Sequence, residues 1–188
     1  MGKLVFVTGG SRSGKSTFAE KRAQAQGDAV TYIATCIPLD DEMKDRVKHH
    51  RERRPAHWAT LEATRDFEKV WTDIPHGAVI LDCITLMITQ LMMELACDWD
   101  HPTTEEAQHA EAVVQHEIDG LIRAIKNYSG TVIVVTNELG MGLVPVFPFG
   151  RIFRDIAGRA NQALALAADE AVFMVSGLPL WLKEEERA

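Results

Sequence analysis

The glycine-rich stretch at residues 9–16, which reads GGSRSGKS, constrains this chain more than any other segment. It matches the pattern G-x-x-x-x-G-K-[S/T], follows an apolar run at 3–8 and opens a helical pattern over 14–26. Glycines let backbone N–H groups turn inward around phosphate oxygens, and the start of the following helix adds partial positive charge. The stretch predicts a phosphate-binding loop between a strand and a helix. The alternative is a glycine-rich turn that binds nothing.

All eight residues of this loop are candidate nucleotide ligands. Lys15 is expected to reach the β- and γ-phosphates and to act in catalysis, and the Ser16 hydroxyl is expected to bind Mg²⁺. The full set is Gly9, Gly10, Ser11, Arg12, Ser13, Gly14, Lys15 and Ser16.

An aspartate ends the apolar run AVILD at 78–82. A carboxylate at the end of a strand beside a phosphate-binding loop can hold Mg²⁺ directly or through water, as the Walker-B aspartate does. Asp82 is therefore a second candidate metal ligand and a nucleotide contact. The alternative is that it caps the following helix.

Five apolar runs alternate with helical patterns along the 188 residues. Strands are predicted at 3–8, 30–35, 78–82, 131–138 and 170–176, and LPLWLK at 178–183 is a candidate sixth. Helices are predicted at 14–26, at 40–54, after the strand at 78–82 to about 97, at about 104–127 and at 151–168. This alternation predicts an α/β fold: a three-layer P-loop nucleotide-binding domain with a mainly parallel sheet flanked by helices, spanning 1–188 as one domain. Ligands of such folds bind at the carboxyl ends of the strands.

Composition narrows the class of protein. The formal net charge of −7 argues against nucleic acid as a partner, and no apolar run reaches the roughly 18–20 residues that a membrane span needs. The three cysteines form no disulfide framework, so we expect reduced thiols and a cytoplasmic location. The chain has no N-K-x-D motif for guanine, which makes a small-molecule kinase or nucleotidyltransferase the better class than a GTPase switch.

Two adjacent histidines lie in the basic segment RVKHHRERRPAHW at 46–58. On a helix over 40–54, His50 shares a face with Met43, Val47 and Arg54, so this face is expected to point at the protein body. A neutral imidazole there is a competent nucleophile toward phosphorus, and nearby cations would stabilise the charge on a phosphate under attack. The helical pattern alone still favours an ordinary surface histidine.

The sequence resembles the CobU/CobP family of cobalamin biosynthesis, whose members are both adenosylcobinamide kinase and adenosylcobinamide-phosphate guanylyltransferase. The resemblance runs nearly end to end. It rests on VTGGSRSGKSTFAE, TYIATC with LDDEM, RVKHHRERRPAHW, LDCITL, VTNELGMGLVP and FRDIAGRANQALA. One departure is VFPFGRI after GMGLVP, where the family usually has a polar, charged stretch.

The resemblance implies two reactions and a set of partners. ATP or GTP phosphorylates adenosylcobinamide; GTP then guanylylates an enzyme histidine, which maps to His50, and the GMP passes on to give adenosylcobinamide-GDP and pyrophosphate. The implied partners are a nucleoside triphosphate, Mg²⁺ and the corrinoid, and the implied assembly is a homotrimer. Further nucleotide contacts implied by the resemblance are Ala34, Thr35, Cys36, Arg51, Glu52, Arg53, Arg54 and Glu62.

Two alternatives stay open. A kinase-only relative would have lost the transferase half, although the retained HHRERR argues against this. A non-catalytic nucleotide-binding protein would bind GTP without turnover. Glu62 alone would be taken as a solvated acidic residue, and Arg154, Gly158 and Asn161, which share a helical face, are expected to serve packing more than a subunit contact.

Overall fold

A computed structural model of the chain describes residues 2–35 and 54–184. The described residues form a seven-stranded sheet in the order β3-β2-β4-β5-β1-β6-β7. Neighbouring strands are parallel except β6 and β7, which pair antiparallel. The strands are β1 (Lys3–Gly9), β2 (Val30–Ala34), β3 (Ala59–Glu62), β4 (Ala78–Asp82), β5 (Thr131–Val135), β6 (Glu170–Val175) and β7 (Leu178–Lys183).

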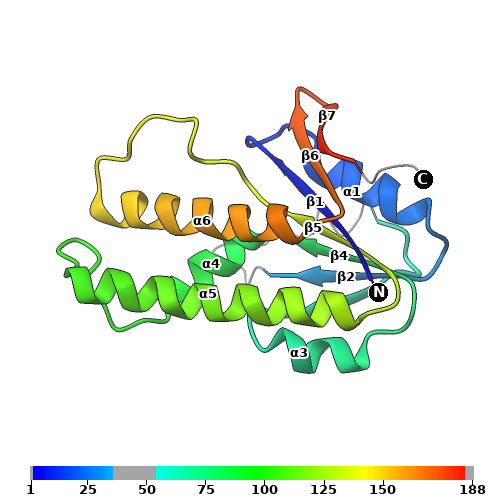
Figure 1. The fold of residues 1–188 in the computed structure, drawn as a ribbon, viewed down its shortest axis with the longest axis horizontal. Helices are drawn as coiled ribbons and strands as arrows, with labels where there is room; N and C mark the ends of the chain where they lie inside the picture. Colours follow the sequence, from blue (N-terminus) through cyan, green and yellow to red (C-terminus); the bar gives the residue numbers. More distant parts are fainter. Residues whose placement is uncertain (1, 36–53, 185–188) are drawn as a thin grey trace.

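Helices cover both faces of this sheet, as Figure 1 shows. One face packs against α1, and the other packs against α3, α4, α5 and α6. The helices are α1 (Lys15–Gln24), α3 (Phe67–Val70), α4 (Ile84–Met93), α5 (Thr104–Asn127) and α6 (Pro148–Ala167), with a short 3-10 turn, η1 (Trp71–Asp73), after α3. The predicted three-layer α/β architecture with a mainly parallel sheet is confirmed.

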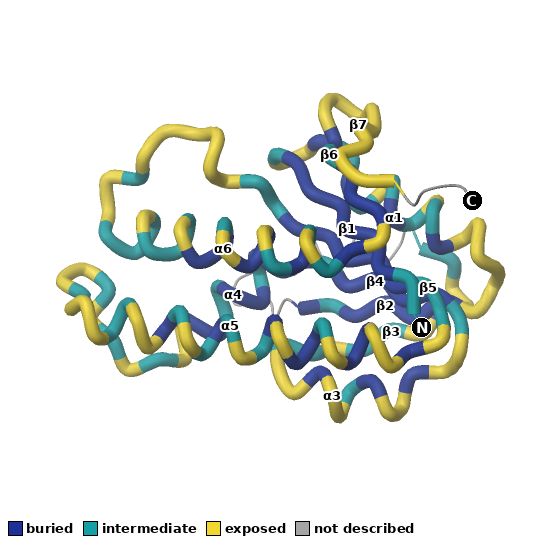
Figure 2. The backbone as a smooth tube through the Cα atoms, viewed as in Figure 1, coloured by how far each residue is buried: buried dark blue, intermediate teal, exposed yellow. Residues whose placement is uncertain are grey.

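Alternate residues of the central strands enter two separate apolar cores. In β1, Leu4 and Phe6 pack with the four-helix side, whereas Val5 and Val7 pack with the α1 side. Because both faces are covered, the central strands are apolar at most positions, and their traces are largely buried in Figure 2. This is why continuous apolar runs were a sound basis for predicting these strands.

The structure differs from the sequence prediction at several boundaries. β3 was not predicted, because its four residues carry no apolar run and none is fully buried. β5 ends at Val135, three residues before the predicted end, and α6 begins at Pro148, three residues before its predicted start. Proline suits the first helical turn, since its missing N–H would have no partner there. The predicted helix over 40–54 lies outside the described residues except for Arg54, which is not helical.

Parallel pairing aligns the ends of strands that are far apart in sequence. Asp82 is in register with Ala34 of β2 and with Val135 of β5. Val135 is in turn paired with Val7, two residues before the end of β1. The glycine-rich loop, Asp82 and the residues after β5 therefore meet at one edge of the sheet.

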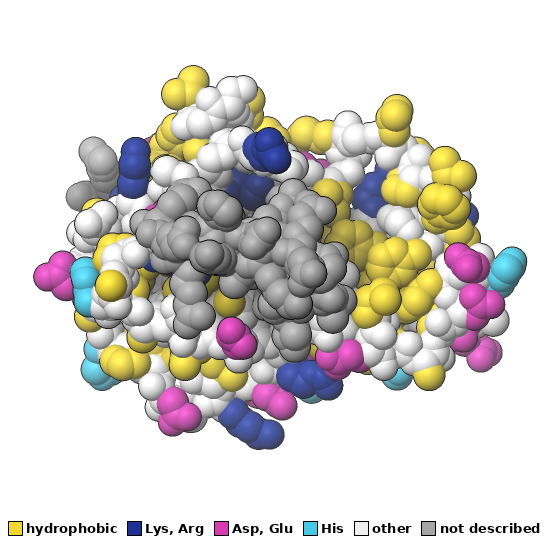
Figure 3. All heavy atoms as spheres, turned by 180° about the vertical axis from the view of Figure 1, so that it is seen from behind, with side chains coloured by type: hydrophobic (Ala, Val, Ile, Leu, Met, Phe, Trp, Pro, Cys, Tyr) yellow, Lys and Arg dark blue, Asp and Glu magenta, His cyan; other side chains and the backbone are white. Residues whose placement is uncertain are grey.

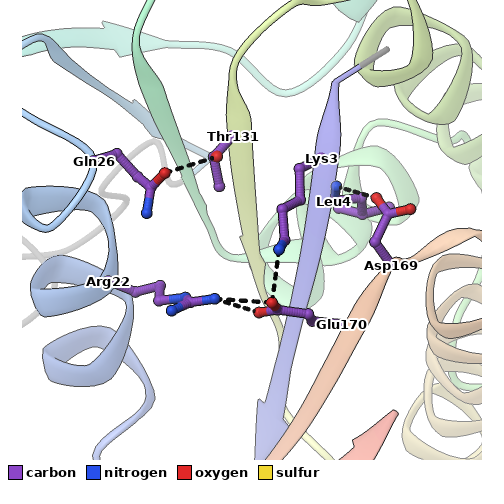
Figure 4. A network of polar contacts seen from close by, with 7 residues as sticks. All are labelled: Lys3, Leu4, Arg22, Gln26, Thr131, Asp169 and Glu170. Atoms are coloured by element: carbon purple, nitrogen blue, oxygen red, sulfur yellow. Dashed lines mark hydrogen bonds and ion pairs between the residues drawn. The ribbon is translucent and has the colours of Figure 1, made fainter. Parts of the chain in front are cut away.

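The opposite edge is fixed by a charged cluster, drawn in Figure 4. Glu170, at the start of β6, accepts two hydrogen bonds from Arg22 of α1, at 2.9 and 2.6 Å, and pairs with Lys3 of β1 at 2.8 Å. Beside it, Asp169 Oδ2 accepts a hydrogen bond of 2.7 Å from the backbone N–H of Leu4. The cluster therefore connects α1 to β1, the strand that leads into the phosphate-binding loop, and to β6, which pairs with β1.

None of the helices within residues 2–35 and 54–184 is long and apolar enough to cross a membrane. The longest, α5, begins at a capping box in which Thr103 and Glu106 exchange hydrogen bonds with each other's backbone.

Candidate active site

The glycine-rich loop connects the end of β1 to the start of α1. Gly14 precedes the helix in a left-handed conformation (φ 97°) and, being glycine, supplies no capping side chain. The start of α1 therefore suits an anionic ligand. Gly9 is required for a different reason: a Cβ there would lie 2.5 Å from the backbone oxygen of Met174 on β6.

Lys15 and Ser13 face the space enclosed by this loop. Lys15 Nζ donates a hydrogen bond of 2.6 Å to the Gly10 carbonyl, and the residue is buried. Burial lowers the pKa of Lys15, and the charge of Asp82 opposes that effect. The Ser13 hydroxyl is also buried and has no hydrogen-bond partner among the described residues. A buried cation beside an unsatisfied hydroxyl fits a phosphate group.

Asp82 joins the loop to the end of β4. Its Oδ2 accepts a hydrogen bond of 2.8 Å from the Ser16 hydroxyl and one of 3.0 Å from the Tyr32 hydroxyl. Burial, and then the charge of Asp82, raise the pKa of Tyr32 above its ordinary value. The tyrosine hydroxyl therefore keeps its proton and remains a donor at neutral pH.

The pair of Ser16 and Asp82 is a suitable donor set for Mg²⁺. One hydroxyl oxygen and one carboxylate lie within hydrogen-bond distance at the mouth of the phosphate-binding loop. Magnesium prefers oxygen ligands and usually completes its shell with substrate phosphates and water rather than with a full protein cage. The two residues predicted as metal ligands are thus brought together.

A cavity of about 480 Å³ opens in front of the loop. Its walls come from three parts of the chain, namely the loop with the start of α1, the end of β4 and the end of β5. The lining residues are Ser11, Arg12, Ser13, Gly14, Lys15, Ser16, Thr17, Asp82, Cys83 and Asn137. The cavity brings together most of the predicted loop with Asp82, as the sequence suggested.

Asn137 and its supports were not among the predicted site residues. Asn137 Nδ2 donates to Thr85 Oγ1 at 2.8 Å, and its backbone carbonyl accepts from Asn161 Nδ2 at 3.1 Å. Asn161 is buried on α6, and its Oδ1 also accepts a hydrogen bond from Thr136. The expectation that Asn161 serves packing is met by these bonds. The only sequence signal for Asn137 was its place near the carboxyl end of the strand predicted at 131–138.

Cys83 lines the same cavity but is not a nucleophile at neutral pH. Burial, and then the charge of Asp82, raise the pKa of its thiol to about 12. Its Sγ lies 3.1 Å from Thr85 Oγ1, and its backbone carbonyl accepts a hydrogen bond of 2.6 Å from Thr35 Oγ1. Both contacts fix the start of α4.

The predicted contacts beyond the loop lie at the ends of neighbouring strands. Ala34 ends β2 in register with Glu62, which is exposed at the end of β3. Thr35 is fully buried, and its hydroxyl donates a hydrogen bond to the Cys83 carbonyl. None of these three is among the residues that line the cavity. The remaining predicted residues, Cys36, His50, Arg51, Glu52 and Arg53, lie outside the described part of the chain.

Arg54 is the first described residue after the basic segment. The centre of its guanidinium group lies 3.6 Å from the centroid of the Tyr32 ring, a close cation–π contact. Arg54 also borders a second cavity of about 260 Å³, together with Pro55, Ala56, Trp58 and Thr60. Tyr32 therefore contacts both Asp82 and one predicted nucleotide contact of the basic segment.

The segment between β5 and α6 leaves the sheet as a long exposed loop, seen in yellow above α6 in Figure 1. It carries exposed apolar side chains, including Leu143 (96% exposed), Val146 (84%) and Phe147 (72%). Figure 3 shows apolar side chains gathered at that end of the molecule. The unusual VFPFG stretch thus forms part of an apolar surface, outside the cavity of the phosphate-binding loop.

Comparison with protein families gives a match over residues 5–182 to the CobU family, described as cobinamide kinase / cobinamide phosphate guanyltransferase. The chain belongs to this family. The bifunctional adenosylcobalamin biosynthesis protein CobU of Salmonella typhimurium is 46% identical over 96% of this chain and 99% of its own length. CobU of Escherichia coli is 44% identical, again over 96% and 99% of the two chains. CobP of Pseudomonas aeruginosa is 37% identical, over 96% of this chain and 97% of its own.

A more distant likeness concerns the fold alone. The solved structure of a protein from Pyrococcus horikoshii OT3 superposes with a TM-score of 0.54 at 7% identity, over 98% of this chain and 88% of that chain. The protein is thus an enzyme of the cobinamide kinase / cobinamide phosphate guanyltransferase family with a P-loop α/β fold.

Proposed function

We propose that this CobU-family enzyme carries out both family reactions on one chain, in the cytoplasm and as a homotrimer. It first phosphorylates the hydroxyl of adenosylcobinamide with ATP or GTP, and then transfers GMP from GTP to the resulting phosphate. The observation that carries the proposal is the Ser16–Asp82 pair at the mouth of the phosphate-binding loop, in a chain matched to the family over residues 5–182.

The first half-reaction uses the residues around the cavity. Lys15 and the first N–H groups of α1 bind the β- and γ-phosphates, and Ser16 with Asp82 would hold Mg²⁺. The ion, when bound, neutralises charge on the phosphates. The hydroxyl oxygen of the corrinoid forms a bond to the γ-phosphorus, the bond from that phosphorus to the bridging oxygen breaks, and the hydroxyl proton is released. The products are the corrinoid phosphate and a nucleoside diphosphate.

The second half-reaction uses His50 as the nucleophile. An imidazole nitrogen of His50 bonds to the α-phosphorus of GTP, the bond to the β-phosphate oxygen breaks, and pyrophosphate leaves. A phosphate oxygen of the corrinoid then bonds to the same phosphorus, the P–N bond breaks, and the histidine is restored. Support for His50 comes from the sequence, where it lies among six Lys and Arg residues between positions 44 and 54.

Incubation with Mg²⁺ and GTP labelled on the α-phosphate, followed by intact-mass measurement and peptide mapping, tests the proposal. We expect an acid-labile, base-stable GMP adduct that is lost in His50→Ala and kept in His49→Ala. The adjacent histidine is the matched control, because it shares the same basic segment. A native protein that binds GTP but forms no adduct would leave only a kinase or a binding protein.

A further inference from the structure

Tyr32 occupies a position that no catalytic role above uses. It lies in β2, paired with Ile80 of β4, and its side chain is only 5% exposed within the apolar core on the α1 side. The hydroxyl at the end of the ring donates to Asp82 Oδ2 at 3.0 Å. A buried hydroxyl needs a partner, and this one finds it in the candidate metal ligand.

The hydrogen bond from Tyr32 helps to fix the orientation of the Asp82 carboxylate. Ser16 and Tyr32 both donate to the same carboxylate oxygen, Oδ2. Among the described residues, no side chain or backbone group donates a hydrogen bond to Asp82 Oδ1. Two donors on one oxygen fix the rotation of the carboxylate and leave the other oxygen available. If Ser16 turns toward a ligand in the cavity, Tyr32 still holds the carboxylate in place.

The ring of the same tyrosine supports a second functional group. Arg54 lies over its face with the guanidinium carbon 3.6 Å from the ring centroid. Arginine stacks on aromatic rings through its planar guanidinium, which the compact ammonium of lysine cannot reproduce. One buried side chain thus contacts Asp82 through its hydroxyl and Arg54 through its ring.

We propose that Tyr32 is a positioning residue for nucleotide binding, holding Asp82 with its hydroxyl and Arg54 with its ring. The proposal rests on the function given above, in which Asp82 acts through Mg²⁺, and on the nucleotide contact that the family resemblance implies for Arg54. The hydroxyl then matters only when the metal is present. The ring matters with and without it.

The test measures the affinity of a non-hydrolysable GTP analogue by calorimetry, once with Mg²⁺ and once with EDTA. We expect Tyr32→Phe to weaken binding about tenfold in the Mg²⁺ arm, on the scale of a lost hydrogen bond to a charged group, and to leave the EDTA arm unchanged. Arg54→Lys is expected to weaken both arms by a similar factor. Tyr128→Phe is the matched control, because Tyr128 is the only other tyrosine and its hydroxyl donates to the Pro75 carbonyl, away from the site.

Two results would overturn the proposal. One is a Tyr32→Phe variant that binds the analogue as tightly as the wild type in both arms. The other is a variant weakened equally in both arms, which a merely structural role would give. Phosphorylation of adenosylcobinamide by Tyr32→Phe should fall in parallel with its Mg²⁺-dependent affinity. If the wild-type protein itself bound no nucleotide, the proposed function would fail instead. A thermal melt of each variant shows whether it is folded.

Discussion

Ser16 and Asp82, 66 positions apart in the sequence, are joined by a hydrogen bond of 2.8 Å from the serine hydroxyl to Asp82 Oδ2. The bond connects the first turn of α1 to the end of β4, across the mouth of the cavity. It places a hydroxyl and a carboxylate where a phosphate-bound Mg²⁺ would need oxygen ligands. The chemistry proposed for the first half-reaction depends on this pair.

Asp82→Asn removes the charge of this pair and preserves its shape. We expect the rate of adenosylcobinamide phosphorylation to fall by about 10²-fold or more, because a preorganised charge near the transferring group is lost. Steady-state kinetics over a range of Mg²⁺ concentrations measures the effect. Wild-type kinetics in this variant, at an unchanged melting temperature, would show that phosphoryl transfer does not use the charge of Asp82.

Gly9→Ala should destabilise the fold. A Cβ at this position would lie 2.5 Å from the backbone oxygen of Met174. Because the clashing atom belongs to the backbone, no side-chain rotation can relieve the contact. We expect a loss of about 1–3 kcal/mol in the free energy of unfolding, typical of overpacking. Gly10→Ala is the control, since no atom lies within 4 Å of its Cβ position. Denaturant unfolding of both variants measures the difference, and equal stability of the two would contradict the packing argument.

Glu170→Gln should weaken the charged cluster at the opposite edge of the sheet. Burial alone would raise the pKa of Glu170, but the hydrogen bonds from Lys3 and Arg22 outweigh it and hold the pKa below the ordinary value of 4.5. Lys3 and Arg22 are about a third exposed, 32% and 33%, so water can solvate them once the charge is lost. We expect a loss of about 2 kcal/mol near neutral pH.

The pH dependence of this loss follows from the sign of the shift. A depressed pKa in the folded state stabilises the protein above the unfolded-state pKa, near 4.5, and this contribution disappears as the pH falls through the folded value. The difference between wild type and Glu170→Gln should therefore be largest near pH 7 and shrink below about pH 4.5. Glu68→Gln, which breaks an exposed pair with Arg123, should leave stability near the wild-type value throughout. A difference that grew with acidification would contradict the assignment.

Asn161→Leu should damage both stability and activity. It leaves the Thr136 hydroxyl and the Asn137 carbonyl without their partner in a buried region. We expect a loss of about 2–3 kcal/mol, the scale for buried polar groups left unsatisfied. Phosphorylation should also slow, because Asn137 lines the cavity. Gln162→Leu, at the exposed neighbouring position, is the control, and equal effects of the two would contradict this role for Asn161.

The loop and the central strands could be predicted because their signals are contiguous in the sequence. The eight residues at 9–16 are adjacent along the chain, and Asp82 could be placed because the ends of parallel strands meet at one edge. β3 could not be predicted, since a four-residue edge strand that is never fully buried needs no apolar run. Its existence depends on pairing with β2.

The hydrogen bonds that organise the site could not be predicted from the sequence, for a different reason. Tyr32 and Asp82 lie 50 positions apart, and Asn137 and Thr85 lie 52 apart. Which hydroxyl meets which carboxylate depends on side-chain directions in neighbouring strands, and no local pattern encodes these. The motif therefore predicted the kind of ligand. The residues that hold the motif in place could be identified only from the three-dimensional structure.

The most direct test of the central claim is to follow adenosylcobinamide through both reactions with ATP, GTP and Mg²⁺, using liquid chromatography and mass spectrometry. Wild-type protein is expected to convert it to the phosphate and then to adenosylcobinamide-GDP. His50→Ala should stop at the phosphate, and Lys15→Ala should leave adenosylcobinamide unmodified. Formation of adenosylcobinamide-GDP by His50→Ala, or a wild-type reaction that ends at the phosphate, would contradict the account of two chemistries on one chain.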